Sequence, residues 1–224
     1  GIHWGAHSAG SWTTAAFTND TYTTTFTHDA TEERIAAEVA TVASASGAVD
    51  LAGNSDIGAS SPAFVLDTQK PTATVAVDTP LVKDSDLTQL VTVTYSEAMN
   101  QSVTPTIAFS AGTTWTDGAG SWTDATHYAR TFTLTDNAEE FTDVDVTVTL
   151  GRDIAGNVQV QGAGTDAFDI DTKNPTAVVT TTLNPIYESS LVQTVIVAYD
   201  ESMNSSSHPE TTFTGTHWGT QAAG

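Results

Sequence analysis

The chain has 224 residues, with 27 acidic side chains against six lysines and arginines, and its net charge at neutral pH is −21. This balance excludes a typical nucleic-acid or anionic-membrane binder, because both surfaces are recognised through clustered basic side chains. The absence of cysteine excludes a disulfide framework and thiolate chemistry.

Taken in chain order, a set of short motifs occurs twice. The first set is AGSW (9–12), TYTTTFT (21–27), VDLAGN (49–54), DTQKPTATV (67–75) and YSEAMN (95–100). The second set is AGSW (119–122), HYARTFT (127–133), RDIAGN (152–157), DTKNPTAVV (171–179) and YDESMN (199–204). Corresponding motifs are 103 to 110 positions apart, so the sequence predicts a tandem array with a period of about one hundred residues, the size of a single domain.

The proline-containing motif marks the start of each repeat, and it sets the expected domain boundaries. Residues 1–68 correspond to the C-terminal half of a repeat, residues 69–172 to a complete repeat, and residues 173–224 to the N-terminal half of the next. Residues 1–10 and 215–224 also match at six of ten positions. Two interpretations remain open: a piece of a longer array of alternating domains, or a subunit whose half domains complete each other between neighbouring molecules.

The residue pattern predicts β-structure throughout. Threonine makes up about a fifth of the chain, and β-branched residues favour strands. Apolar and polar residues alternate in five stretches of the complete repeat, namely 72–78, 90–96, 128–135, 144–150 and 167–171. About seven short strands in a hundred residues predict a two-sheet antiparallel sandwich.

One segment, residues 32–44, has helix-favouring composition. Its counterpart at residues 139–150 does not, and equivalent repeats are expected to fold alike. We therefore expect a strand here, with a short helical turn near 32–36 as the alternative.

Together these motifs resemble the bacterial immunoglobulin-like repeats strung along large cell-surface adhesins and biofilm proteins. The resemblance covers essentially the whole chain and depends on the threonine-rich strand, the D.AGN loop and the proline linker. It implies an all-β fold of tandem Ig-like antiparallel β-sandwich domains in a linear array. It also implies an extracellular or bacterial cell-surface location and a structural or adhesive role.

In such a sandwich, the linker and two loops meet at the end where one domain joins the next. This geometry predicts that Asp67, Glu97 and Asp153 converge at one joint, and that Asp171 and Glu201 take the same places at the following joint. Gathered carboxylates repel one another unless a cation lies between them, and Ca²⁺ prefers oxygen ligands of this kind. We therefore expect calcium-binding joints.

Two other interpretations of the acidic residues remain open. The aspartate of each D.AGN loop can simply close a turn, with Gly53 and Gly156 at positive φ. A second acidic set at the opposite end of the domain could provide the ligands instead. That set comprises Glu139, Glu140, Asp84, Asp86, Asp169 and Asp171, with Glu32, Glu33 and Asp67 as its counterpart in the preceding copy.

The sequence contains no common hydrolase, metalloprotease or phosphate-loop motif, so we expect no enzymatic activity. His3 beside Trp4 and His217 beside Trp218 are expected to pack, as are Trp12 and Trp122, although an exposed tryptophan could also stack on sugar.

The expected function is a non-enzymatic extracellular stalk or filament whose partners are neighbouring copies of itself, with no membrane span in this segment. An adhesin module that binds surface glycan or protein, and a polymerising subunit, are the alternatives.

Overall fold

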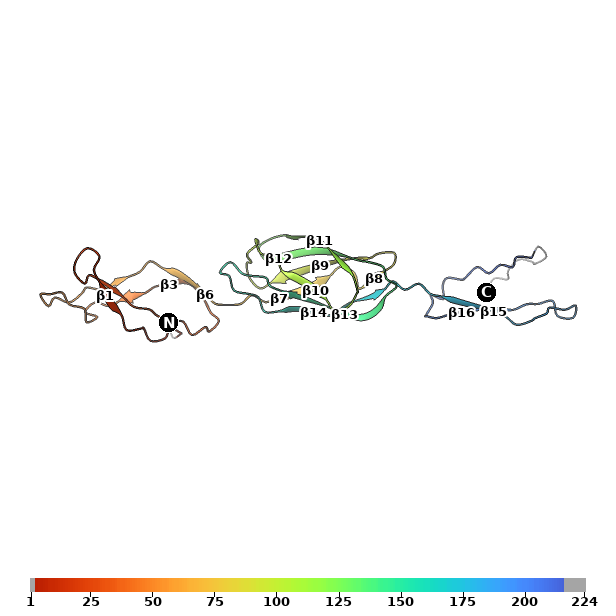
Figure 1. Cartoon of the computed structure of the whole chain (residues 1–224), viewed down its shortest axis with the longest axis horizontal. Coiled ribbons are helices and arrows are strands. Elements are labelled where there is room, and N and C mark those ends of the chain that lie inside the picture. The colour runs from red at the N-terminus through yellow and green to blue at the C-terminus, as the bar shows by residue number, and fades with distance from the viewer. Residues whose placement is uncertain (1–2, 216–224) are drawn as a thin grey trace. The chain divides into compact units, whose positions relative to one another are not determined.

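The computed structural model describes residues 3–215, and every regular element in that range is a β-strand (Figure 1). The strands are β1 (Ser11–Thr13), β2 (Thr21–Thr23), β3 (Arg34–Glu38), β4 (Thr41–Val42), β5 (Ala59–Ser60), β6 (Phe64–Asp67), β7 (Ala73–Val77), β8 (Leu81–Lys83), β9 (Thr88–Tyr95), β10 (Thr106–Phe109), β11 (Trp115–Trp122), β12 (His127–Leu134), β13 (Glu140–Thr149), β14 (Gly162–Asp171), β15 (Ala177–Thr181) and β16 (Val195–Tyr199). The predicted all-β class is confirmed. Within the described part of the chain, no helix has the length and apolar character needed to cross a membrane.

The chain forms two compact units, one ending at Thr172 and the other beginning at Lys173. For clarity, we refer to residues 3–68 as the N-terminal segment, residues 69–172 as the middle repeat, and residues 173–215 as the C-terminal segment.

The middle repeat is one curled sheet of eight strands in the order β10-β13-β14-β7-β9-β12-β11, with β8 also paired to β14 (Figure 1). Most pairs are antiparallel, but β14 pairs in parallel with both β7 and β8. The expected two-sheet, purely antiparallel arrangement is therefore not what this repeat shows: its strands form one sheet, and that sheet is mixed. The first strands of the repeat lie beside its last strand and run in the same direction.

The curl encloses a core built from alternating side chains. In β9, Val91 and Val93 are fully buried and Tyr95 is 4% exposed, as their period-two spacing predicts. Phe109 of β10 packs edge-on against Phe132 of β12, with ring centroids 4.9 Å apart, although these strands lie near opposite ends of the strand order. The sheet therefore closes over one apolar interior.

The N-terminal segment repeats the strand pairing of the second half of the middle repeat. In β3 and β6, Arg34 pairs with Asp67, just as Glu140 of β13 pairs with Asp171 of β14. Residues 32–44, which have helix-favouring composition, form strands β3 and β4, so the repeat-based expectation is correct and no helical turn forms there. Pairing with β6 outweighs local propensity at this position.

The first hairpin of the N-terminal segment also matches its counterpart. Trp12 lies opposite Tyr22 in the β1–β2 pair, and Trp122 lies opposite Tyr128 in the β11–β12 pair. The ring centroids are 5.1 Å and 5.3 Å apart, respectively. The recurrent AGSW motif therefore produces the same aromatic pair in both copies.

The C-terminal segment repeats the pairing of the first half of the middle repeat. In the β15–β16 pair, Val179 lies opposite Val197, and in the β7–β9 pair Val75 lies opposite Val93. Each residue is 104 positions from its counterpart, so the register is identical. The sequence repeats are thus repeats of strand register as well.

Candidate metal centre at the joint between residues 3–68 and the middle repeat

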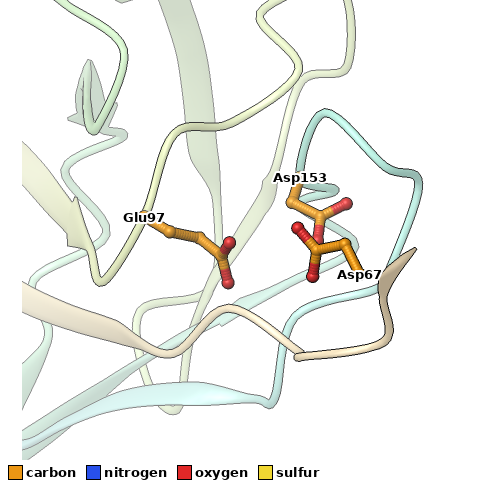
Figure 2. Close-up of side chains that lie close together, drawn as sticks. All are labelled: Asp67, Glu97 and Asp153. Atoms are coloured by element: carbon orange, nitrogen blue, oxygen red, sulfur yellow. The ribbon is translucent and has the colours of Figure 1, made fainter. Parts of the chain in front are cut away.

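Asp67, Glu97 and Asp153 each provide a carboxylate oxygen, and these three oxygens all lie within 4.8 Å of one another. Figure 2 shows the three side chains pointing toward one another from separate segments. Asp67 is the last residue of β6, Glu97 follows β9, and Asp153 follows β13. The convergence expected from sandwich geometry is therefore present, and the binding of a metal by these residues stays a prediction.

Asp153 is buried, with only 1% of the residue exposed, and its carboxylate closes the D.AGN loop. Its Oδ1 accepts hydrogen bonds from the backbone N–H groups of Gly156 (2.6 Å) and Asn157 (2.7 Å), and its Oδ2 accepts from Asn157 Nδ2 (2.7 Å). Gly156 has φ of 99°, as the turn interpretation expects. Asn157 Nδ2 also donates to the carbonyl of Asp67 (3.1 Å), which ties the loop to the linker.

Asp50 makes the same turn in the N-terminal segment. It accepts from the backbone N–H of Asn54 (2.8 Å) and from Asn54 Nδ2 (2.8 Å), and Gly53 has φ of 87°. Hydrogen bonds to the charged form lower the pKa of Asp50. The aspartate therefore closes the turn in both D.AGN loops, but only Asp153 also has two further acidic side chains, Asp67 and Glu97, close to it.

Arg34 is a residue of this site that sequence reasoning missed. Its Nε lies 3.3 Å from Asp67 Oδ2 and its Nη1 lies 3.2 Å from Glu97 Oε2. The side chains of Asp67 and Glu97 are only 8% and 10% exposed, while that of Arg34 is 53% exposed. Arg34 could have been assigned to the site from its cross-strand pairing with Asp67, but the spacing of the motifs alone does not reveal this pairing.

The charges at this site are not balanced by the protein. When all are ionised, three carboxylates and one guanidinium leave a net charge of −2. Burial raises the pKa of Glu97, the charges of Asp67 and Asp153 raise it further, and Arg34 opposes the rise. A divalent cation has the charge that would neutralise the site, and carboxylate oxygens are its preferred ligands.

The other two predicted ligands do not belong to this cluster. Asp171 ends β14 and pairs with Glu140, and Glu201 follows β16 in the other compact unit. Glu201 Oε1 is shielded from solvent and has no hydrogen-bond partner. Metal binding by Asp171 and Glu201 at a second joint stays a prediction.

The alternative acidic set is largely engaged in local contacts. The Glu139 carboxylate accepts from the backbone N–H of Thr113 (3.0 Å) and from its hydroxyl. Its counterpart Glu33 contacts His28 Nε2 at 2.6 Å. Among residues 3–215, Asp67, Glu97 and Asp153 are the one set of acidic side chains that lie close enough together to hold an ion.

The histidines and tryptophans of the repeats pack against neighbours. His3 contacts Asp29, and Trp4 packs edge-on against His28 with ring centroids 5.3 Å apart. Trp122 packs between Tyr95 and Tyr128, at 5.6 Å and 5.3 Å, while its counterpart Trp12 is 52% exposed. His217 and Trp218 lie outside the described residues.

Comparisons of the chain with protein-family models, with curated proteins and with solved structures gave no match.

Proposed function

We propose that this chain is a non-enzymatic structural part of an extracellular stalk or filament on a bacterial cell surface. In this proposal, tandem Ig-like β-sandwich domains form the stalk, and calcium bound by Asp67, Glu97 and Asp153 stiffens the joint between consecutive domains. The resemblance of the motifs to immunoglobulin-like adhesin repeats supports the class and the location.

The observation that carries the proposal is the convergence of acids from both sides of a repeat boundary. Asp67 comes from the strand before the linker, and Glu97 and Asp153 come from loops of the following repeat. A metal held by all three would restrain the linker that joins the repeats. Arg34 partly fulfils this role already, because it bridges Asp67 and Glu97 across the same boundary.

The donor set suits calcium in charge and in ligand type. Each of the three carboxylates offers one oxygen close to the other two, and Ca²⁺, which takes six to eight oxygens, would draw the rest of its ligands from further carboxylate oxygens, backbone carbonyls or water. The two backbone N–H bonds from Gly156 and Asn157 occupy Asp153 Oδ1, but Oδ2 accepts one hydrogen bond, from Asn157 Nδ2, and keeps a lone pair for a cation. We expect Arg34 to move away from Glu97 when the ion binds, since its side chain is half exposed.

The proposal is tested by attaching a fluorophore pair across the joint of the full chain, one in residues 3–68 and one in residues 69–172. Calcium is expected to narrow the distribution of distances between them and to raise the melting temperature, and EDTA is expected to reverse both effects. Identical distributions and melting curves with calcium and with EDTA would contradict the stiffening role.

Asp50 and Asp153 provide a matched pair of variants for this test. Asp50→Asn and Asp153→Asn both weaken a D.AGN turn of the same geometry. Only Asp153→Asn should abolish the calcium response, because Asp50 lies outside the acidic cluster. Loss of the response in both variants, or in neither, would favour turn closure alone.

The adhesin alternative receives less support from the structure. The exposed Trp12 is suited to stacking on sugar, but its counterpart Trp122 is used for packing against Tyr95 and Tyr128. We therefore place the structural role first, and glycan binding by the full chain would reverse this order.

A further inference from the structure

Within residues 3–215, Arg34 is the basic side chain that forms ion pairs with the acidic cluster of the joint. Its Nε lies 3.3 Å from Asp67 Oδ2, and its Nη1 lies 3.2 Å from Glu97 Oε2. These two nitrogens belong to one planar guanidinium, so a single side chain holds two carboxylates at a fixed spacing. Arg34 and Asp67 come from residues 3–68, whereas Glu97 comes from the middle repeat. The guanidinium therefore bridges the repeat boundary.

The two acids of the middle repeat are fixed relative to each other. Glu97 and Asp153 lie in separate loops, and the loops are joined where Met99 forms a backbone bridge with Asp153. Met99 is 3% exposed, so this junction is anchored in the core of the repeat. Arg34 and Asp67 are carried together by the β3–β6 pair, in which they lie opposite each other. The site therefore has one half on each side of the boundary, and the cation belongs to the half before the linker.

Strand pairing alone does not require an arginine at this place. In the middle repeat, β13 pairs with β14, and Glu140 lies opposite Asp171 as Arg34 lies opposite Asp67. Opposite charges across a strand pair are favourable, whereas like charges directly opposite each other are destabilising. One copy of the repeat thus carries a cation where the other carries an acid, although the strands pair in the same way. The arginine is a property of this joint and not of the fold.

The guanidinium engages two of the three carboxylates that a metal would need. The side chains of Asp67 and Glu97 are 8% and 10% exposed, so their attraction for Arg34 is screened less by water and salt than that of a surface pair. A Ca²⁺ ion held by the three acids would lie close to the guanidinium, and the two positive charges would repel each other. Calcium must therefore displace Arg34 from at least one acid, and this displacement weakens its binding.

We propose that Arg34 is a built-in cation of the joint, which holds Asp67 to Glu97 while calcium is absent and competes with calcium for both acids when the ion is present. Arg34 would then set the calcium concentration at which the joint changes from the arginine-bridged to the metal-bound state. The metal-bound state is the stiffer one, because the ion also engages Asp153. The competition rests on the calcium site of the proposed function, whereas the arginine bridge does not.

The competition is tested by titrating calcium into the full chain with the fluorophore pair across the joint. Arg34→Gln should lower the calcium midpoint by about tenfold or more, because the variant lacks the positive charge beside the ion. Lys70→Gln is the matched control: it removes the same charge from the linker, but Lys70 contacts Glu32 (3.6 Å) and is not paired with the three acids. Its midpoint should stay within about twofold of the natural value, since exposed charges are screened.

The outcomes of this titration separate the two proposals. A calcium response with the same midpoint in the natural chain and in Arg34→Gln would overturn the competition and leave the proposed function standing. No calcium response in either protein would overturn the proposed function and the competition together.

The arginine bridge is tested in EDTA, where the result does not depend on the metal site. Arg34→Gln should broaden the distribution of distances across the joint, and Lys70→Gln should leave it unchanged. Arg34→Lys keeps the charge but lacks the planar fork that reaches two acids, so it should broaden the distribution while its calcium midpoint stays near the natural value. This variant also serves if Arg34→Gln fails to fold. Distributions in EDTA that are the same for the natural chain and the Arg34 variants would overturn the bridge.

Discussion

Glu97 is the residue at which the electrostatics of the joint can be measured. Its pKa in the folded protein is raised by burial and by the charges of Asp67 and Asp153. A carboxyl group with a raised folded-state pKa binds more protons in the folded than in the unfolded protein. The stability that this group contributes is therefore present at low pH and is lost as pH rises through the unfolded and then the folded pKa.

The Glu97→Gln variant tests this relation. Without calcium, the variant should lose the part of the pH dependence that lies just above the usual glutamate range, and it should be at least as stable as the natural chain near neutral pH. With calcium it should gain less stability than the natural chain. The measurement is chemical unfolding between pH 4 and pH 8, with and without the ion; pH curves that coincide for both proteins would contradict the role of Glu97.

The surroundings of Gly120 explain why the AGSW motif contains a glycine. A Cβ added at Gly120 would overlap the Tyr128 ring, and one at Gly10 would overlap the Tyr22 ring. Gly120→Ala should therefore lower the free energy of unfolding by about 1–3 kcal/mol, because Tyr128 is buried and cannot move aside. Gly10→Ala should have a smaller effect, since Tyr22 is half exposed and can shift. Thermal unfolding of the two variants measures the difference.

At the scale of the elements, a buried glutamine fastens the start of each repeat. Gln89 is fully buried; its Oε1 accepts from the Thr79 N–H (3.3 Å) and its Nε2 donates to the Thr79 carbonyl (3.0 Å). Gln193 makes the same two bonds with Leu183, at 2.9 Å and 2.7 Å. This side chain ties the residues that follow β7 to the start of β9 in the middle repeat, and the residues that follow β15 to those before β16 in the C-terminal segment.

Gln89→Ala should destabilise the chain by about 2 kcal/mol or more, because it leaves a buried N–H and carbonyl without their side-chain partner. Gln101→Ala is the control, since Gln101 is exposed and bonds to one loop carbonyl; a change below about 0.5 kcal/mol is expected there. Denaturant titration measures the loss in free energy of unfolding for each variant. Equal losses would argue against the fastening role of Gln89.

In the middle repeat, the sequence predicted most of the longer strands whose side chains alternate and missed the short strands β8 and β10. The spacing of Val91, Val93 and Tyr95 identified β9, and the repeats identified β3 as a strand against its local composition. By contrast, β11 contains Gly118 and Gly120 and does not alternate apolar with polar residues, so its residue pattern did not predict a strand. The parallel pairing of β14 left no local signal either, since strand direction is set by the fold as a whole.

The candidate site was predicted in part for a similar reason. Asp67, Glu97 and Asp153 lie in motifs that recur, and the geometry of a sandwich brings those motifs to one end. Arg34 lies outside every recurrent motif, and the equivalent position in the middle repeat is Glu140. Its place beside Asp67 depends on the register of one strand pair, which the sequence alone does not specify.

At the scale of the whole molecule, stability should be unevenly distributed. The middle repeat encloses a fully buried core, whereas β1, β2 and β15 of the flanking segments are exposed along their length. Hydrogen exchange at low protein concentration should therefore be slow in β9 and β12 and fast in these three strands. Uniform protection across all of these strands would contradict this picture.

The parallel pairing of β14 with β7 and β8 has a mechanical consequence. The chain enters the middle repeat at β7 and leaves it at the end of β14, and these ends of two parallel strands lie at opposite ends of the pair. A pull along the chain therefore strains the hydrogen bonds of β14 with its parallel neighbours in shear, all at once, instead of opening them one after another like a zipper. Such an arrangement is suited to a protein that must withstand tension from flowing water or from the movement of a cell.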